Sequence, residues 1–348
     1  MFVRHRSWPC ALLLSAAVPR LAAAAFTNDP QLAATIERGR RLGDDAAKQL
    51  EATVALHPND LAAHAELLGY FYDRSAAFPQ RRLTQVLWMI RHRPADPLTA
   101  AYGPVNPLSD GPGYAAASAA WDAQVSAHPT DTAVLADAAA FFDNGTDTPK
   151  AQDLLRRAID AEPRSALWPA RLARSLDRQA DRQPDQAAVL CNQALALRQL
   201  AYKLTPDRAD RFHVLTGTPM DAYRGGDLIS AKRFASDLLQ AADDFPDDPG
   251  HGEAVHRANI VLGEVALHSG NTDRAEEYLA AAAKVSSSPA LATAGPDLTL
   301  AKELLAKGER TPVRDYLVAC QSWWTAGHDR LARWVATLDA GGTPDWGS

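Results

Sequence analysis

One short stretch of this 348-residue chain contains the residue types that bind metal ions. His251 and His256 lie on either side of Glu253. A helical zinc pair needs two histidines four positions apart, so that both imidazoles share one face, and a third ligand from elsewhere. Here the histidines are five positions apart, and Pro249-Gly250 places His251 before the predicted helix. We therefore expect a solvated helix start and no metal site.

The other residues that could do chemistry also lack the spacing that the chemistry needs. The acidic run 243–248 has neither the ligand spacing nor the glycine of a calcium loop. Cys191 and Cys320 are far apart in sequence and are expected to be buried in helices. The sequence contains no glycine-rich phosphate loop and no nucleophile elbow. It therefore predicts no cofactor and a protein that is not an enzyme.

The elements that hold these residues are marked by a proline that recurs after each helix-forming run. The set is Pro58, Pro94, Pro129, Pro163, Pro206, Pro246 and Pro289, at steps of 36, 35, 34, 43, 40 and 43 residues. Self-similarity at such a period is typical of repeat architectures. Helix formers dominate between the prolines, and alternating β-branched runs are nearly absent. We predict an all-α solenoid.

The clearest repeat unit lies between residues 252 and 287. Gly263 in the first predicted helix and Ala275 in the second are small enough for two antiparallel helices to cross closely. Gly270 supplies a left-handed end for the first helix, and Asn271 can begin the second. This pattern predicts a helix–turn–helix unit that packs on copies of itself.

These residues, and the similar pattern from Thr132 to Pro163, resemble tetratricopeptide repeats. The resemblance implies a right-handed superhelix of antiparallel helix pairs, with a concave face that holds a peptide or a partner protein. The whole chain also resembles a group of uncharacterised bacterial tetratricopeptide proteins. The stretches that carry this second resemblance are 85–90, Gly113-Tyr114, 167–172, Ser288-Pro289 and 295–305.

The expected elements are helix pairs with one irregular connection. A single helix is expected at about 113–127 and a last one at about 328–340. The segment 94–112 contains five prolines, which cannot lie inside a helix. It is either an ordered plug over exposed core or a binding loop. The predicted pairs are 30–56, 61–92, 132–161, 165–203, 209–243, 252–284 and 296–325.

The first 25 residues differ from the rest and resemble a secretory signal peptide. They are basic, then apolar, and end in small residues at Ala23-Ala24-Ala25. We predict export to the periplasm or out of a bacterial cell; the alternative is a cytoplasmic protein with an N-terminal extension. The repeat domain then covers 26–325, and a capping helix and tail cover 326–348.

Charge narrows the range of partners. Without residues 1–25 the chain has 33 basic and 42 acidic residues, a net charge of about −9. Such an acidic chain, for which we expect no basic stripe, argues against nucleic acid and anionic membrane surfaces as partners. The apolar stretch at the start is too short for a stable membrane span. An unknown protein or peptide is the expected partner.

The candidate binding residues come from the last repeats. The first helices carry Ala136, Ala140, Ile260 and Glu264 where a carboxylate clamp would need Lys, Arg or Asn, which argues against a chaperone-adaptor role. Neighbours on a helix differ by about 100°, so two adjacent tryptophans cannot both face one core. One is expected in the core, and the other either packs on the capping helix or is a surface anchor for a partner. The candidates are Arg257, Glu264, Lys302, Trp323 and Trp324.

The predicted function is that of a non-catalytic protein–protein interaction scaffold, a monomer or weak oligomer, that binds its partner on a concave face. One alternative is an exported α/α-toroid-like hydrolase or lyase that acts on polysaccharide, since seven tryptophans remain after the first 25 residues. Another is a structural subunit of an envelope complex. The capping helix is expected to expose Arg330, Arg333 and Asp339 and to bury Leu331, Trp334, Val335 and Leu338.

Overall fold

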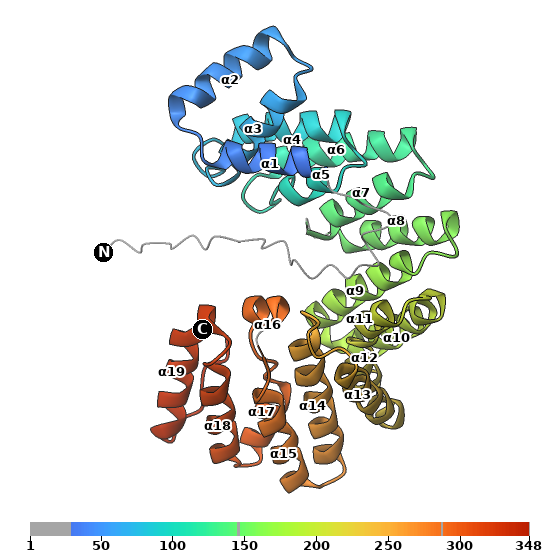
Figure 1. Cartoon of the computed structure of the whole chain (residues 1–348), viewed down its shortest axis with the longest axis vertical. Coiled ribbons are helices and arrows are strands. Elements are labelled where there is room, and N and C mark those ends of the chain that lie inside the picture. Colours follow the sequence, from blue (N-terminus) through green and yellow to red (C-terminus); the bar gives the residue numbers. More distant parts are fainter. Residues whose placement is uncertain (1–28, 145–146, 287, 348) are drawn as a thin grey trace. The chain divides into compact units, whose positions relative to one another are not determined.

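The computed structural model describes residues 29–144, 147–286 and 288–347, and every regular element in them is a helix (Figure 1). The predicted signal peptide lies outside these residues. The chain divides into two compact units at Val214–Leu215. We call residues 29–214 the N-terminal unit and 215–347 the C-terminal unit.

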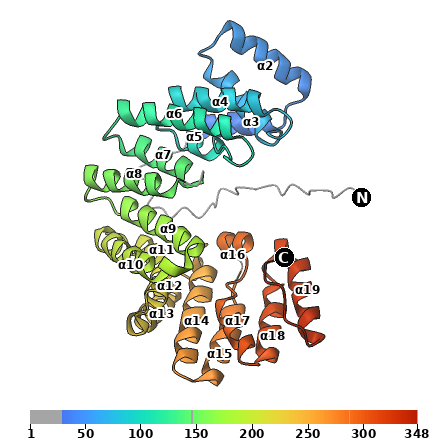
Figure 2. The same ribbon diagram turned by 180° about the vertical axis from the view of Figure 1, so that it is seen from behind.

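The N-terminal unit is built from consecutive helices joined by short turns. Within it α3 packs on α4, α7 on α8 and α9 on α10, and α1 lies against α3 (Figures 1 and 2). The pairs predicted at 61–92, 132–161 and 165–203 are confirmed, whereas the two helices of the predicted pair 30–56 each pack on α3. The helices are α1 (Pro30–Arg40), α2 (Asp44–Leu56), α3 (Leu61–Tyr72), α4 (Pro79–His92), α5 (Pro97–Tyr102), α6 (Gly111–Ala127), α7 (Thr132–Asn144), α8 (Thr148–Ala161), α9 (Leu167–Arg182), α10 (Ala187–Leu204) and α11 (Arg208–Leu215), which ends at the boundary.

The segment 94–112 contains a helix that we did not expect. The short helix α5 begins at Pro97, and Pro112 lies in the first turn of α6. A proline is tolerated in a first turn because the N–H that it lacks has no partner inside the helix there. Leu98 and Tyr102 are buried, and α5 packs against α3, α4 and α7. The segment therefore covers core between neighbouring helices, as the plug alternative expected.

In the C-terminal unit α14, α15, α17, α18 and α19 lie side by side (Figures 1 and 2). The pair predicted at 209–243 is instead three helices, because Gly217 and Pro219 interrupt the first of them. The helix α16 begins at Pro289 and was not predicted. The helices are α12 (Thr218–Arg224), α13 (Leu228–Asp243), α14 (His251–His268), α15 (Thr272–Ala283), α16 (Pro289–Ala294), α17 (Thr299–Ala306), α18 (Arg310–Cys320) and α19 (His328–Asp339).

The turn and crossing chemistry predicted for residues 252–287 is confirmed. A Cβ atom added at Gly263 would overlap the Leu300 side chain, so Leu300 would have to move to admit any larger residue at the crossing. Gly270 has a φ of +80°, the left-handed conformation that ends α14. The Asn271 side chain accepts a hydrogen bond from the backbone N–H of Arg274 at 3.1 Å and caps α15.

The last helix, α19, has the expected buried side. Leu331, Trp334 and Leu338 are buried, while Arg333 and Asp339 are exposed. Asp339 accepts a hydrogen bond from Nε of Arg314 at 2.6 Å, which ties α19 to α18. Among the described residues, every helix is too short or too polar to cross a lipid bilayer.

Candidate functional site

The two adjacent tryptophans of the C-terminal unit are both buried, with 3% and 6% of Trp323 and Trp324 exposed. Trp323 donates from Nε1 to the carbonyl of Ala283 at 3.1 Å, and Trp324 packs against Gly295 and Trp334. The surface-anchor alternative is therefore wrong, and Trp324 instead packs on Trp334 of α19, the capping helix, as the other alternative expected. The helix α18 ends at Cys320, so both side chains lie in the turn beyond it and the 100° rule for helices does not separate them.

The basic candidates of the same unit lie at the surface. Arg257 is half-buried, and its Nε is 2.9 Å from Glu253 Oε1, one turn earlier in α14. Lys302 on α17 is exposed, and its Nζ lies 6.0 Å from the centre of the Trp346 ring. Arg257 is thus already paired with a carboxylate of its own helix, and Lys302 lies near an aromatic ring of the C-terminal tail.

Glu264 is completely buried, which rules out the direct contact with a partner that we predicted. Its Oε2 accepts the hydroxyl hydrogen of Tyr223 on α12 at 2.8 Å, and its Oε1 is buried without a hydrogen-bond partner. Burial, together with the nearby Glu303 carboxyl on α17, raises the pKa of Glu264 to about 8. Ile260 is buried too, because α12, α13, α15 and α17 cover α14.

His256 is also buried, and both of its ring nitrogens are used. Nδ1 donates to the carbonyl of Ala282 at 2.8 Å, and Nε2 accepts the backbone N–H of Asp297 at 3.1 Å. Burial lowers the pKa of His256, which favours the neutral ring. No group of three metal-ligating side chains comes together in the described parts of the chain.

The N-terminal unit contains a feature that our sequence reasoning missed, a stripe of arginines on α9. Arg171, Arg174, Arg178 and Arg182 recur at intervals of three or four residues, so they lie on one face of the helix. The spacing itself is the signal that could have revealed the stripe. Arg198 on α10 adds a fifth arginine beside it. We call Arg171, Arg174, Arg178 and Arg198 the arginine cluster.

Most of these arginines are held by neighbouring helices. Arg178 forms an ion pair with the buried Asp143 of α7. Arg198 forms an ion pair with Asp177 of α9. Arg182, at the end of the stripe, donates from Nη2 to Thr148 Oγ1 on α8 at 2.7 Å. These contacts fix the guanidinium groups in place along the helix.

Arg174 differs from the ion-paired arginines of the cluster because no carboxylate of a described residue forms an ion pair with its guanidinium. Within the described residues it makes no hydrogen bond or ion pair, and it is exposed to solvent. Partial enclosure by protein and the guanidinium groups of Arg198, Arg178 and Arg171 lower the pKa of Arg174 to about 10. It therefore keeps its positive charge at neutral pH, among three other positive charges.

Asp137 on α7 faces Arg171 but is not hydrogen-bonded to any described residue. Only 3% of it is exposed, and its Oδ2 atom is buried without a partner. Burial raises the pKa of Asp137 to about 8, although Arg171 acts in the opposite direction. At neutral pH the carboxyl of Asp137 is thus mostly protonated.

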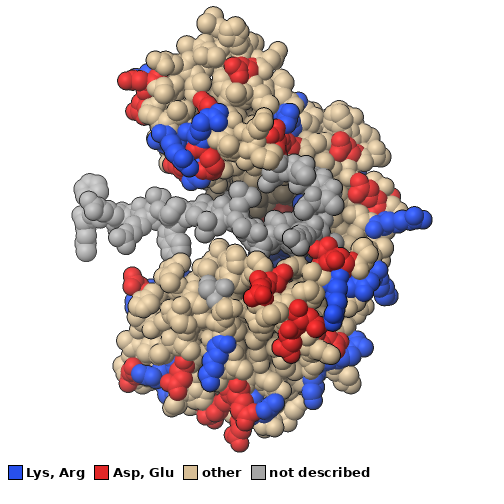
Figure 3. Space-filling model, in the orientation of Figure 1, with Lys and Arg blue, Asp and Glu red and all other residues tan. Residues whose placement is uncertain are grey.

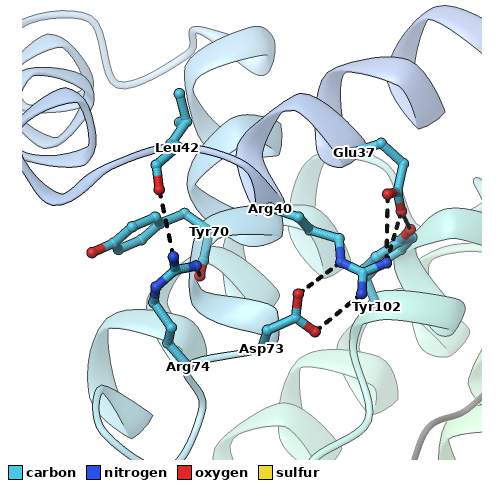
Figure 4. A network of polar contacts seen from close by, with 7 residues as sticks. All are labelled: Glu37, Arg40, Leu42, Tyr70, Asp73, Arg74 and Tyr102. Carbon is cyan, nitrogen blue, oxygen red and sulfur yellow. Dashed lines mark hydrogen bonds and ion pairs between the residues drawn. The ribbon is translucent and has the colours of Figure 1, made fainter.

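A second polar network of the N-terminal unit shows the contrasting case, in which each charged side chain has a hydrogen-bond partner (Figure 4). Arg40 of α1 binds both oxygens of Asp73, with Nε and Nη2 at 2.8 and 3.2 Å. Tyr102 of α5 donates its hydroxyl hydrogen to Glu37 of α1 at 2.6 Å. The network ties α1, α3 and α5 together, so we assign it a structural role.

No protein-family model matches the chain, and no curated protein matches it with significant similarity. The evidence for a function therefore comes from the charges and contacts of the site itself. On the face shown in Figure 3, outside the grey atoms, Lys and Arg alternate with Asp and Glu and no large area has a single sign. The unmatched charge at Arg174 is a local feature.

Proposed function

We propose that this protein is a non-catalytic scaffold that binds an acidic segment of a partner protein through the exposed face of α9. The supporting observation is the exposed, unpaired Arg174 among the other arginines of the cluster. The proposal includes the tetratricopeptide-type superhelix that the sequence resembles, a bacterial source and export directed by residues 1–25. The protein is a monomer or weak oligomer in this proposal.

A guanidinium that has no ion-pair partner destabilises the protein on its own. The same group can stabilise an interface with an anionic partner. Like charges close together destabilise the fold, and Arg174 forms no ion pair with a described residue, although the Asp177 carboxylate is near enough to act on it. A planar guanidinium fork fits the two oxygens of a carboxylate, and arginine is enriched among residues that dominate binding energy. The elements around it are stacked helix pairs, which offer extended surfaces for partners.

The polysaccharide-enzyme alternative needs two carboxyl groups about 5 to 10 Å apart with the sugar between them. Glu264 and Glu303 are one pair of carboxyls that come together in the C-terminal unit. Glu264 is completely buried and within hydrogen-bonding reach of Glu303. A sugar cannot enter between them, so this pair does not support a hydrolase or lyase. A structural subunit of an envelope complex would also have a partner protein. Affinity purification of that partner therefore tests this alternative too.

Affinity purification from cells of the source organism, with the mature chain as bait, tests the proposed function. We expect one specific partner to be recovered with the wild-type bait and with Arg164→Glu, an exposed arginine outside the cluster. The Arg174→Glu bait should lose it. Recovery of no specific partner under several extraction conditions would contradict the proposal. Size-exclusion chromatography with light scattering checks the oligomeric state of the bait.

A further inference from the structure

We propose that the C-terminal unit carries a second binding site, which accepts an extended segment of a partner protein in which an aromatic residue follows a proline by two positions. Residues 341–347 of this chain, which we call the tail segment, fill that site in the structure. The side chains that hold the tail segment belong to α17, α18 and α19. The site is therefore a different surface from the α9 face and does not depend on Arg174.

The tail segment is an extended stretch that begins where α19 ends. Gly341 has a φ of +79°, the left-handed conformation that ends a helix, and the N–H of Gly342 donates to the carbonyl of Thr337 at 2.9 Å. Residues 342–345 then form neither helix nor turn. Glycine allows more backbone conformations than any other residue. The two glycines are therefore a hinge through which the tail segment can leave while α19 stays folded.

Hydrogen bonds to backbone carbonyls hold the tail segment on the unit. Arg310 of α18 donates from Nη1 to the carbonyl of Gly342 and from Nη2 to that of Gly341, both at 2.8 Å. Trp334 of α19 donates from Nε1 to the carbonyl of Asp345 at 2.8 Å. Every residue of any peptide has a backbone carbonyl, so these donors select an extended backbone and no particular sequence.

Two side chains of the tail segment, Trp346 and Pro344, give the surface its preference. The Trp346 ring lies 5.3 Å from the Trp334 ring at an angle of 61°, an edge-to-face arrangement that aromatic pairs favour. Nζ of Lys302, one of the candidate binding residues, is 6.0 Å from the centre of the Trp346 ring. Pro344 is buried, and its ring fixes φ at a value suited to an extended segment. The surface thus fits a Pro-x-aromatic pattern.

Trp334 shows why this surface needs an occupant. Only 4% of Trp334 is exposed with the tail segment in place, and its indole N–H finds its acceptor in that segment. Departure of the tail segment alone would expose the aromatic ring and remove the acceptor. A partner segment with the same pattern restores both contacts. Because a segment on a short tether has an effective concentration of roughly millimolar, we expect the tail segment to compete strongly with the partner.

Fluorescence anisotropy with a labelled synthetic peptide of residues 341–347 tests the site on the folded chain. The receptor is the mature chain with Trp346→Ala, in which the tethered competitor is weakened. We expect the peptide to bind this variant at least tenfold more tightly than wild type, and a peptide carrying Trp346→Ala to bind neither. Adding Trp334→Phe to the receptor keeps an aromatic ring but removes the N–H, and should weaken the peptide about tenfold. Circular dichroism confirms that each receptor is folded.

Three results would overturn the inference. The first is no binding to the Trp346→Ala chain at peptide concentrations up to about 1 mM. The second is equal binding of the two peptides, and the third is equal binding of the peptide to both chains. Lys302→Gln, at an exposed position, replaces Trp334→Phe if that variant does not fold, and should weaken the peptide about twofold.

Light scattering and capture decide which molecule supplies the segment. A wild-type dimer that Trp346→Ala abolishes would assign the surface to the tail segment of a second copy and contradict a partner protein. A protein captured by the Trp346→Ala chain supports the inference if the peptide releases it and the Trp346→Ala peptide does not; capture of no such protein contradicts it. Arg174→Gln should leave peptide binding unchanged. Failure of the α9 site and failure of this site are therefore separate results.

Discussion

Replacing Asp137 by asparagine tests whether a carboxyl buried without a partner is protonated in the folded protein. Its pKa is about 8 in the fold against 3.8 for a free side chain, because burial disfavours the charged form. Between these values the folded chain holds a proton that the unfolded chain releases. The free energy of unfolding therefore falls as pH rises through this range and levels off above about pH 8.

The magnitude follows from the range of pH that the experiment covers. Each pH unit between the two pKa values changes the free energy of unfolding by about 1.4 kcal/mol. Between pH 6 and pH 9 the free energy of unfolding changes only up to about pH 8, the pKa of Asp137 in the fold. Asp137 therefore lowers the free energy of unfolding by about 2 to 3 kcal/mol over this range. Asparagine has almost the same shape and does not ionise. The stability of Asp137→Asn relative to wild type should thus rise by about 2 to 3 kcal/mol between pH 6 and 9.

Urea unfolding followed by circular dichroism at pH 6, 7, 8 and 9 measures this difference. The matched control is Asp143→Asn, a buried aspartate on the same helix that is paired with Arg178. Removal of a paired carboxylate should destabilise the protein at every pH in the range, by about 1 to 3 kcal/mol. A stability difference between Asp137→Asn and wild type that stays constant from pH 6 to 9 would refute the reasoning, since it would mean that Asp137 is already ionised at pH 6.

Three further predictions concern packing and charge elsewhere in the two units. Glu264→Gln should, like Asp137→Asn, gain stability relative to wild type as pH rises toward 8, measured by the same unfolding series. Gly263→Ala should lower the urea midpoint through overlap with Leu300, by about 1 to 3 kcal/mol in stability, whereas Gly111→Ala, with open space around it, should not. Tyr102→Phe should cost about 1 kcal/mol and speed proteolysis after α5, because it removes the hydroxyl that donates to α1.

Local signals in the sequence were enough to predict the long helices and their pairing. Gly270 and Gly308 adopt positive φ at helix ends, and small residues allow the crossing at Gly263. The short helices were missed because Pro97 and Pro289 were treated as breakers. Both prolines lie in a first turn, where a proline begins a helix instead of ending it.

The candidate site was less predictable because the pairing of its arginines depends on residues that are distant in sequence. The spacing of the arginines in α9 was readable, but not the fact that Asp143, which lies 35 residues before Arg178, pairs with it and leaves Arg174 unmatched. Likewise, Glu264 was expected on an open face. Its burial results from α12 and α17, which no local pattern places against α14.

The affinity of the captured partner for the mature chain tests the central claim most directly. Titration calorimetry at two salt concentrations should compare wild type, Arg174→Gln and Arg164→Gln. We predict that Arg174→Gln binds about tenfold more weakly and with a smaller salt dependence, while Arg164→Gln matches wild type. Equal affinity and equal salt dependence of all three proteins would contradict the account, because Arg174 would then have no part in binding.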